Sequence, residues 1–395
     1  MCSKVLDKEY DIVVVGAGPS GSMAAKVAAE LGASVLVVEK KRAIGVPVAC
    51  AEGISKPVLN SLMAPKPSWI ATEVVGAIVT TPSGRSCKIE HPDAGYILER
   101  KMFDRDLAAM AVEAGACLLT NAEVVGLLSE NHRVVGVEVS HRGNKKVVRS
   151  KVLIGADGVN SRVARWTSIY GELLPEDYHA CAEYLLGRVE VDLGYTEFLS
   201  GNEVAPGGYA WIFPKSEATA NVGLGISPHL TKKKPFEYLD ELVEKRFPHA
   251  SKLETISGSV PTSPADRLVG DGVMLVGDAA RVSDPMTGAG IANGLFSAAI
   301  AGRVAARCSK EGDVSRKALS QYEKEWNKKH GKDLRYRARA REVFLKLTDD
   351  DFETIFDFVE KYFDGKIVRE LRPRQLVVPL IKSSPRFLAL ARHLM

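Results

Sequence analysis

The 395-residue sequence lacks several features that mark other classes of protein. None of its six cysteines forms a Cys-x-x-Cys pair or a zinc-ligand spacing, which predicts reduced thiols and no metal site. No apolar run reaches the ~20 residues that a membrane-spanning helix needs, and residues 1–10 have no signal-peptide core. The net charge of +4 gives no indication of nucleic-acid binding. These absences predict a cytoplasmic globular protein, long enough for two domains.

Glycine is plentiful, and its first informative cluster is Gly16-Ala17-Gly18-Pro19-Ser20-Gly21. A short β-branched run over residues 11–15 precedes the cluster and predicts a buried parallel strand. The alanine-rich residues 21–31 predict a helix, and residues 34–38 predict the next strand. The segment therefore has the pattern of a βαβ unit.

The glycine spacing is typical of a dinucleotide-binding turn. Gly16 permits the tight turn, Gly18 lets the backbone approach a pyrophosphate, and Gly21 allows close packing of helix on strand. The helix N-terminus then offers N–H groups to the phosphates. Glu39, at the end of the second strand, can accept hydrogen bonds from both hydroxyls of an adenosine ribose. The alternative interpretation is a glycine turn that binds no ligand.

A second cluster lies more than 250 residues further along the chain. Residues 273–276 predict a buried strand that leads into Gly277-Asp278-Ala279-Ala280-Arg281. Asp278 at the strand end can bind the ribityl hydroxyls of a flavin. Gly288, Gly290 and Ile291 open a helix that runs to residue 306, and its N-terminus would favour a reduced, anionic flavin. Two clusters so far apart predict one extended cofactor, FAD, held at both ends.

This arrangement resembles the glutathione-reductase-like FAD fold of the aromatic hydroxylases. The resemblance implies an α/β fold: a Rossmann FAD domain, an inserted antiparallel substrate domain and a helical C-terminal region. Antiparallel strands are expected within 182–225, and a short helix at 56–62 in a long loop. The expected ranges are 1–75, 96–170 and 270–310 for FAD, 76–95 and 171–269 for substrate, and 311–395 for the helical region. The resemblance also implies that three further residues contact the cofactor: Arg100, Val124 and Asp157.

An aromatic pattern follows within the expected substrate domain, with Pro206 and Pro214 on either side of it. Tyr209, Trp211 and Phe213 are two residues apart, so on a strand all three side chains point to one face. Such a row can line a slot for an apolar chain, and it can equally be part of an ordinary core strand.

Together with the loop of residues 45–53, the aromatic pattern makes nearly the whole chain similar to the archaeal geranylgeranyl reductases, and within them to the branch acting on digeranylgeranylglycerophospholipids. That family hydrogenates the double bonds of isoprenoid chains in membrane lipids. The resemblance implies that Cys50, Ala51 and Gly53 contact FAD. For Cys50 three interpretations stand: a core residue, a flavin neighbour or a catalytic proton donor. Pro206, Tyr209, Trp211 and Phe213 would form the substrate wall.

The resemblance implies partners and leaves rival functions. The substrate would be an isoprenoid glycerophospholipid, and an external donor (ferredoxin, a deazaflavin or NAD(P)H) would reduce the flavin. One rival function is an FAD-dependent monooxygenase of the aromatic-hydroxylase type. The other is a non-enzymatic prenyl-lipid carrier, which would contain no flavin.

The C-terminal part is basic. Residues 324–346 hold nine Lys or Arg and three acids, and Arg335, Arg337, Arg339 and Arg341 are predicted to spread over a helix surface. Further on, Phe387, Ala391 and Leu394 stand at helical spacing among Arg386, Arg392 and His393. A basic helix with an apolar stripe can rest on anionic lipid at the cytoplasmic face of a membrane, and the same stripe can pack on the protein itself.

Overall fold

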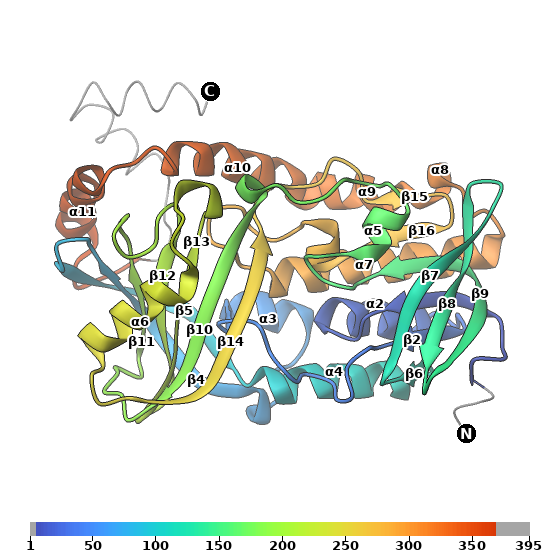
Figure 1. Cartoon of the computed structure of the whole chain (residues 1–395), viewed down its shortest axis with the longest axis horizontal. Helices are drawn as coiled ribbons and strands as arrows, with labels where there is room; N and C mark the ends of the chain where they lie inside the picture. The colour runs from blue at the N-terminus through green and yellow to red at the C-terminus, as the bar shows by residue number, and fades with distance from the viewer. Residues whose placement is uncertain (1–4, 369–395) are drawn as a thin grey trace. The chain divides into compact units, whose positions relative to one another are not determined.

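The computed structural model describes residues 5–368, which form two compact units, each built from three segments (Figure 1). Unit 1 comprises residues 5–48, Arg100–Leu173 and Pro261–Arg335. Unit 2 comprises Ala49–Glu99, Leu174–Val260 and residues 336–368. Both units are therefore discontinuous in sequence.

The two units divide the chain differently from the ranges expected above. Residues 49–75 belong to unit 2, because strands β3 (Gly53–Ile54) and β4 (Ile70–Thr80) both pair with β5 (Ser86–Leu98). Residues 311–335 belong to unit 1, where α8 (Arg316–Leu319) and α9 (Gln321–Trp326) pack on α7 (Ile291–Glu311). The assignment of an FAD role and a substrate role to particular ranges stays a prediction.

Unit 1 is built on a largely parallel sheet. Its strands run in the order β15-β16-β9-β1-β2-β6, and the β1, β2, β6, β9 and β16 pairings are parallel. The strand bounds are β15 Val269–Gly270, β16 Val273–Leu275, β9 Asn144–Gly155, β1 Tyr10–Val15, β2 Val35–Val38 and β6 Cys117–Leu119. Strands β7 (Ala122–Glu130) and β8 (Arg133–His141) extend β9 into an antiparallel ribbon.

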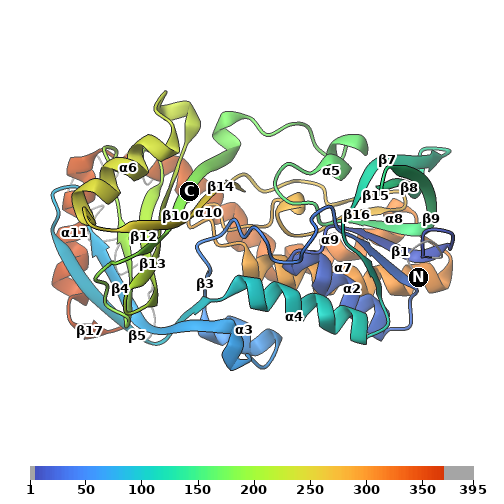
Figure 2. The same ribbon diagram turned by 60° about the horizontal axis from the view of Figure 1, so that its bottom comes forward.

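Helix α2 (Pro19–Glu30) packs against both α7 and α4 (Arg100–Glu113) in unit 1 (Figure 2). A Cβ atom on Gly302 of α7 would lie 2.5 Å from the Ala24 carbonyl oxygen of α2, so a glycine is needed where the two helices cross. The remaining elements are α5 Arg162–Trp166, η4 Gly277–Ala280, η5 Asn327–Gly331 and α10 Lys332–Phe344, which continues into unit 2.

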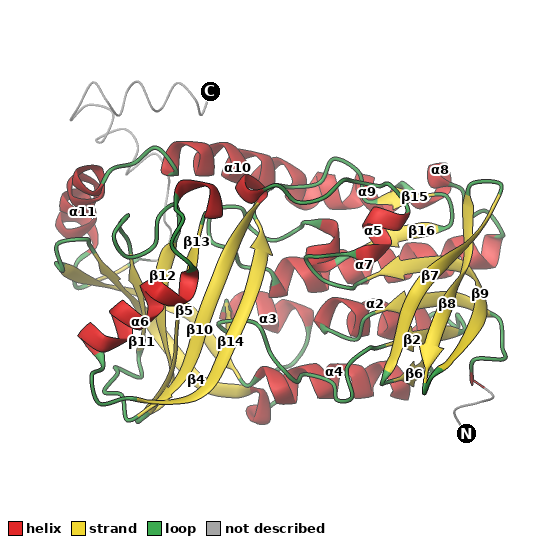
Figure 3. Cartoon of the chain, viewed as in Figure 1, coloured by secondary structure: helices red, strands yellow, loops and turns green. Residues whose placement is uncertain are grey.

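Unit 2 is built on a mainly antiparallel sheet, sheet B, in the order β14-β10-β13-β12-β11-β4-β5-β17 (Figure 3). The further strand bounds are β14 Ser251–Pro261, β10 Tyr178–Gly187, β13 Thr219–Ile226, β12 Tyr209–Ser216, β11 Tyr195–Leu199 and β17 Lys366–Ile367. The helices are α3 Lys56–Leu62, α6 Pro235–Arg246, α11 Asp349–Phe363 and the short turns η1 Pro67–Trp69, η2 Pro175–Asp177 and η3 Pro228–Leu230.

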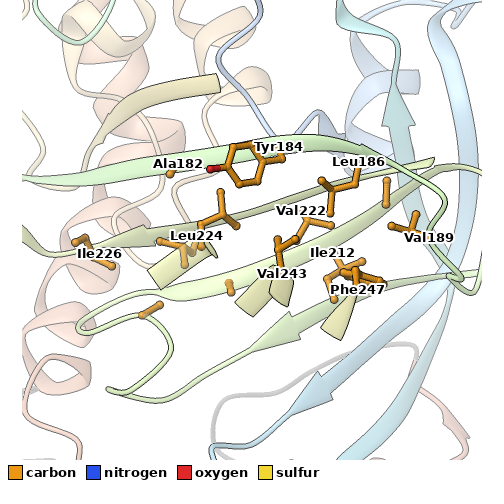
Figure 4. Packing of buried hydrophobic residues seen from close by; sticks show 14 residues of the cluster. Ala182, Tyr184, Leu186, Val189, Ile212, Val222, Leu224, Ile226, Val243 and Phe247 are labelled. Carbon is orange, nitrogen blue, oxygen red and sulfur yellow. The ribbon is translucent and has the colours of Figure 1, made fainter. Parts of the chain in front are cut away.

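One face of sheet B forms the core of unit 2. Side chains of β10, β12 and β13 pack there with Leu239 and Val243 of α6 and with Phe247 (Figure 4). The strands alternate, so their intervening residues point to the opposite face. Among residues 5–368 no helix is both long enough and apolar enough to cross a bilayer.

Candidate functional site

Three glycine-containing turns meet at the carboxyl ends of β1, β9 and β16 in unit 1. Gly16 has φ +101°, and a Cβ atom on it would lie 2.4 Å from the Ala156 carbonyl oxygen. A Cβ atom on Gly277 would lie 2.4 Å from Ser20 Oγ. The turns at residues 16–21, 155–158 and 277–281 are therefore in contact, at the edge where open α/β sheets bind nucleotides.

The first turn has the shape that a pyrophosphate needs. A Cβ atom on Gly21 would lie 1.9 Å from the Gly16 carbonyl oxygen, so helix and strand approach as closely as backbone allows. At Gly18 the same construction meets no atom within 4 Å, which leaves open space at the helix end. Gly18 caps α2 without a side-chain hydrogen bond, so no side chain competes for the first N–H groups of the helix.

Glu39 lies buried directly after β2, beside that turn. Its Oε2 accepts a hydrogen bond from Ala17 N at 2.7 Å, and its Oε1 accepts one from Lys41 N at 2.8 Å. These bonds fix the carboxylate next to the phosphate turn, and a carboxylate has lone pairs for further donors. The position suits a ribose, and the contact itself stays a prediction.

The second glycine cluster, at residues 277–291, presents a carboxyl group whose side chain forms no hydrogen bond with the described residues. Asp278 is the second residue of η4, and a Cβ atom on Gly290, the N-cap of α7, would lie 3.2 Å from its Oδ1. Desolvation raises the pKa of Asp278 to about 6, against the opposing charge of Arg100. A desolvated carboxyl at a strand end is suited to accept hydroxyl groups of a ligand such as a ribityl chain. Gly288 lies in the loop that precedes α7, and Ile291 is the first residue of α7.

Two of the residues predicted to contact the cofactor form hydrogen bonds with other side chains or backbone groups of the protein. Arg100 forms a two-pronged ion pair with Asp104 on the same helix, at 2.6 and 2.9 Å. Asp157 accepts from Ser161 Oγ at 2.6 Å and from Arg162 N at 2.7 Å, so it holds the start of α5. The third contact, Val124, is buried on β7. Whether any of them contacts FAD stays a prediction.

The aromatic row lies in unit 2, on the face of sheet B opposite α6; we call it the aromatic face. Trp211 and Phe213 are each 8 % exposed and pack with Val74 and Ile97. Tyr209 lies 6.0 Å from Trp211 between ring centroids, at 65°. Phe198, which the sequence pattern did not include, meets Phe213 edge-on at 5.5 Å. Pro206 precedes the strand, and its carbonyl accepts from Ser227 N at 2.9 Å.

Glycines beneath these rings make the aromatic face possible. A Cβ atom on Gly223 would lie 2.6 Å from Trp211 Cζ2, and one on Gly53 would lie 2.9 Å from Phe213 Cε2. Gly225 would meet the Cys181 Sγ at 3.2 Å. The rings therefore rest on bare backbone, which a larger residue at these positions would prevent. Sequence reasoning missed Gly223 and Gly225, although they occupy alternate positions of one strand.

A buried polar group borders the aromatic face, and sequence reasoning also missed it. Lys215 Nζ donates to Glu52 Oε2 and to the Leu98 carbonyl, both at 2.6 Å. Asn221 Nδ2 donates to the same Glu52 oxygen at 2.8 Å. Lys215 continues the alternate positions of the aromatic row, which was the one available signal. Glu52 itself has φ +73°, an uncommon conformation for a non-glycine residue.

A second carboxyl group, Glu183 of β10, faces the same rings. Its Oε2 accepts from Trp211 Nε1 at 2.8 Å. Burial, chiefly, raises the pKa of Glu183 to about 8. An acidic residue between the buried Ala182 and Tyr184 was the sequence signal for this group.

The loop with Cys50 belongs to unit 2. Cys50 Sγ accepts from Glu52 N at 3.2 Å, and Ala51 packs against the aromatic cluster. Gly53 begins β3. Contact of Cys50, Ala51 and Gly53 with FAD stays a prediction.

The four arginines of the basic segment lie on helix α10 and face different sides of it. Arg335, Arg337 and Arg339 are exposed. Arg341 is buried, and its guanidinium donates to Ser227 Oγ at 2.9 Å. A spacing of two residues on a helix turns successive side chains by about 200°, which spreads the four side chains around the helix. Residues 386–394 lie outside the described residues.

Two models of known protein families match segments of this chain. A family model for FAD dependent oxidoreductases matches residues 11–160, and one for the geranylgeranyl reductase catalytic domain matches residues 177–260.

Individual relatives match nearly the whole chain. It is 44 % identical over 387 residues to digeranylgeranylglycerophospholipid reductase 1 of Methanococcoides burtonii, covering 92 % of this chain and 95 % of that one. It is 42 % identical to the reductase of the same name from Methanosphaerula palustris, with 96 % of both chains covered.

Solved structures give the same fold. The crystal structure of a geranylgeranyl bacteriochlorophyll reductase-like protein from Thermoplasma acidophilum superposes with a TM-score of 0.91 at 33 % identity, covering 98 % of this chain and 100 % of that one. A flavin-dependent brominase superposes at 0.74 with 20 % identity, covering 96 % and 100 %, and shows the fold alone. The predicted fold class is confirmed, and the chain is an FAD-dependent oxidoreductase of the digeranylgeranylglycerophospholipid reductase family.

Proposed function

We propose that this protein hydrogenates C=C bonds of geranylgeranyl chains in archaeal membrane glycerophospholipids, using FAD. The observation that carries the proposal is the aromatic face of unit 2, on which Tyr209, Trp211 and Phe213 stand in a row. The names of the relatives support the substrate, and the family model over residues 177–260 covers the strand that bears these rings.

Several residues of unit 1 would hold the cofactor. The turn at residues 16–21 would bind the pyrophosphate, Glu39 the adenosine ribose, and Asp278 the ribityl hydroxyls. Reduced FAD supplies a hydride from flavin N5. The N-terminus of α7 at Gly290 and Ile291 would stabilise the negative charge of the reduced flavin.

The substrate chemistry explains why aromatic residues are useful here. An isolated alkene has no carbonyl to accept the charge of a hydride, so the reaction needs a proton as well and develops cationic character on carbon. Electron-rich rings such as Tyr209 and Trp211 stabilise a nearby cation. The Cys50 thiol is predicted to lie beside the flavin, where a thiol or a water molecule can give a proton.

Two partners belong to this proposal. An external electron donor (ferredoxin, a deazaflavin or NAD(P)H) would reduce the flavin. The protein would take its lipid at the cytoplasmic face of the membrane, where the exposed Arg335, Arg337 and Arg339 of α10 would meet anionic headgroups. Binding to anionic but not to neutral vesicles, lost at high salt, is the expected sedimentation result.

The direct test is a single turnover of the dithionite-reduced protein with geranylgeranyl lipid. We expect oxidation of the flavin, followed by absorbance, and a product heavier by two hydrogens for each bond reduced, measured by mass spectrometry. Unchanged flavin absorbance and fully unsaturated lipid would refute the proposal. An oxygenated product under air would instead indicate a monooxygenase, and a colourless protein that binds the lipid would indicate a carrier.

A further inference from the structure

Strand β10 places Glu183 on the aromatic face, and the proposed function assigns no role to this carboxyl group. Its neighbours Ala182 and Tyr184 point into the core beneath α6, so Glu183 points to the opposite face. The residue is 3 % exposed. Its Oε2 accepts from Trp211 Nε1 at 2.8 Å, whereas its Oε1 is buried and has no hydrogen-bond partner among the described residues.

The sheet is built to bring this carboxyl group to Trp211. Glu183 pairs with Gly223, and Gly223 pairs with Trp211, so the three residues form one row across β10, β13 and β12. Because a Cβ atom on Gly223 would lie 2.6 Å from the indole, glycine is what lets the ring cross β13 and reach the carboxyl. An anchor for the indole would require only a neutral acceptor, such as glutamine.

The charged groups around Glu183 leave it without a cation. Lys215, the nearby cation, is bound to Glu52 at 2.6 Å and to Glu99 at 3.2 Å. Glu254 of β14 adds a further negative charge, and burial raises the pKa of the neighbouring Cys181 thiol to about 12, so that it stays neutral.

These surroundings fix the protonation state. Burial first, and then Glu52 and Glu254, raise the pKa of Glu183 to about 8 against the Trp211 hydrogen bond and the Lys215 charge. The raised pKa favours the protonated acid at neutral pH. Since Oε2 accepts the indole N–H, the proton of that acid would be on Oε1, where the described residues offer no acceptor.

We propose that Glu183 supplies the proton of the alkene reduction from Oε1 to a chain lying on the aromatic face. This inference rests on the proposed function. The O–H bond breaks while the π electron pair of the alkene forms a C–H bond with that proton. The hydride that bound, reduced FAD would supply accounts for the second electron pair and the other C–H bond. Trp211 Nε1–H stays on Oε2 and stabilises the carboxylate left behind, which a solvent proton neutralises before the next turnover.

The test compares wild-type protein with Glu183→Gln in the single-turnover assay. The amide keeps an acceptor for Trp211 and removes the acidic proton. We expect a loss of about 100-fold or more in rate, with an unchanged flavin spectrum and melting temperature. The wild-type rate should fall above pH about 8, where the acid ionises, and the residual rate of the variant should lack that fall. Glu190→Gln, an exposed carboxyl in the same unit, should keep the wild-type rate.

Three outcomes would overturn the inference. The first is a Glu183→Gln rate within about 3-fold of wild type. The second is the same alkaline fall in the variant, which would assign the proton to another group such as the Cys50 thiol. The third needs no variant: a wild-type rate that does not fall between pH 7 and 9. If wild-type protein reduces no lipid, the proposed function fails, and if both proteins reduce it equally, only this inference fails.

Discussion

The buried ion pair between Lys215 and Glu52 offers the sharpest test of how unit 2 is held together. The two side chains are 9 % and 7 % exposed, and their charged atoms lie 2.6 Å apart. Replacement of Lys215 by Met keeps most of the side-chain volume and removes the ammonium group. The Glu52 carboxylate then stays buried without its cation. We expect the free energy of unfolding to fall by about 3–5 kcal/mol, since loss of one partner leaves an uncompensated buried charge.

The double variant Glu52→Gln, Lys215→Met separates this cause from lost packing. It contains no buried charge at the pair, and Asn221 can still donate to the amide oxygen at residue 52. Because two neutral groups of similar volume often replace a buried ion pair at little cost, we expect the double variant within about 2 kcal/mol of wild type. The double variant would thus be more stable than Lys215→Met alone, which shows as a coupling energy in the mutant cycle.

Urea denaturation followed by tryptophan fluorescence measures these differences, because Trp69 and Trp211 are both buried in unit 2. Lys145→Met is the matched control. Its ion pair with Glu138 is 3.2 Å long, with side chains 62 % and 37 % exposed, and should contribute less than about 1 kcal/mol. The reasoning is refuted if Lys215→Met costs no more than Lys145→Met, or if the double variant is the least stable of the set.

Three further predictions concern Gly21, Gly223 and His179. Gly21→Ala should give colourless protein by flavin absorbance, because its Cβ would lie 1.9 Å from the Gly16 carbonyl, whereas Gly171→Ala, with open space around it, should stay yellow. Gly223→Ala should lower the free energy of unfolding by about 1–3 kcal/mol in urea, because its methyl group overlaps the indole beside it; an unchanged midpoint would contradict this. Burial lowers the pKa of His179 to about 3, so at a pH between about 3 and 6.5 the unfolded chain binds a proton at this residue and the native protein does not. Stability should therefore fall as pH decreases from about 6.5 towards 3, and urea midpoints of His179→Gln should fall less.

The sequence predicted the parts of the fold that depend on neighbouring residues. The first βαβ unit was predicted because β-branched runs and glycines follow one another within 30 residues, and the predicted helix at 56–62 is α3, Lys56–Leu62. Strands β4 and β5 were not predicted, and Pro92, Asp93 and Gly95 are residue types that interrupt a strand pattern. In the structure Val74 pairs with Gly95 and Gly76 pairs with Glu90, so residues 91–94 bulge out of a continuous strand.

The polar groups of unit 2 were beyond prediction for a different reason. Trp211 lies 28 positions from Glu183, and Lys215 lies 163 positions from Glu52. Such pairs arise only when the register of sheet B is set, and no local pattern encodes that register. The aromatic row itself could be predicted, since its period of two lies within one strand. The residues that pack against the row could not be predicted.

The two faces of β13 differ in a way that supports the proposal of a substrate wall for that row. A strand in an ordinary core carries side chains on both faces, but β13 carries Val222 and Leu224 towards α6, with Gly223 and Gly225 on the opposite face, where Gly223 lies against the Trp211 ring. Burial of Glu183 beside the rings has a cost that an apolar residue of similar size would avoid. The combination of bare backbone, a supported row of rings and a buried carboxyl group supports the proposed function, in which this face would hold an apolar chain and bring a proton to it.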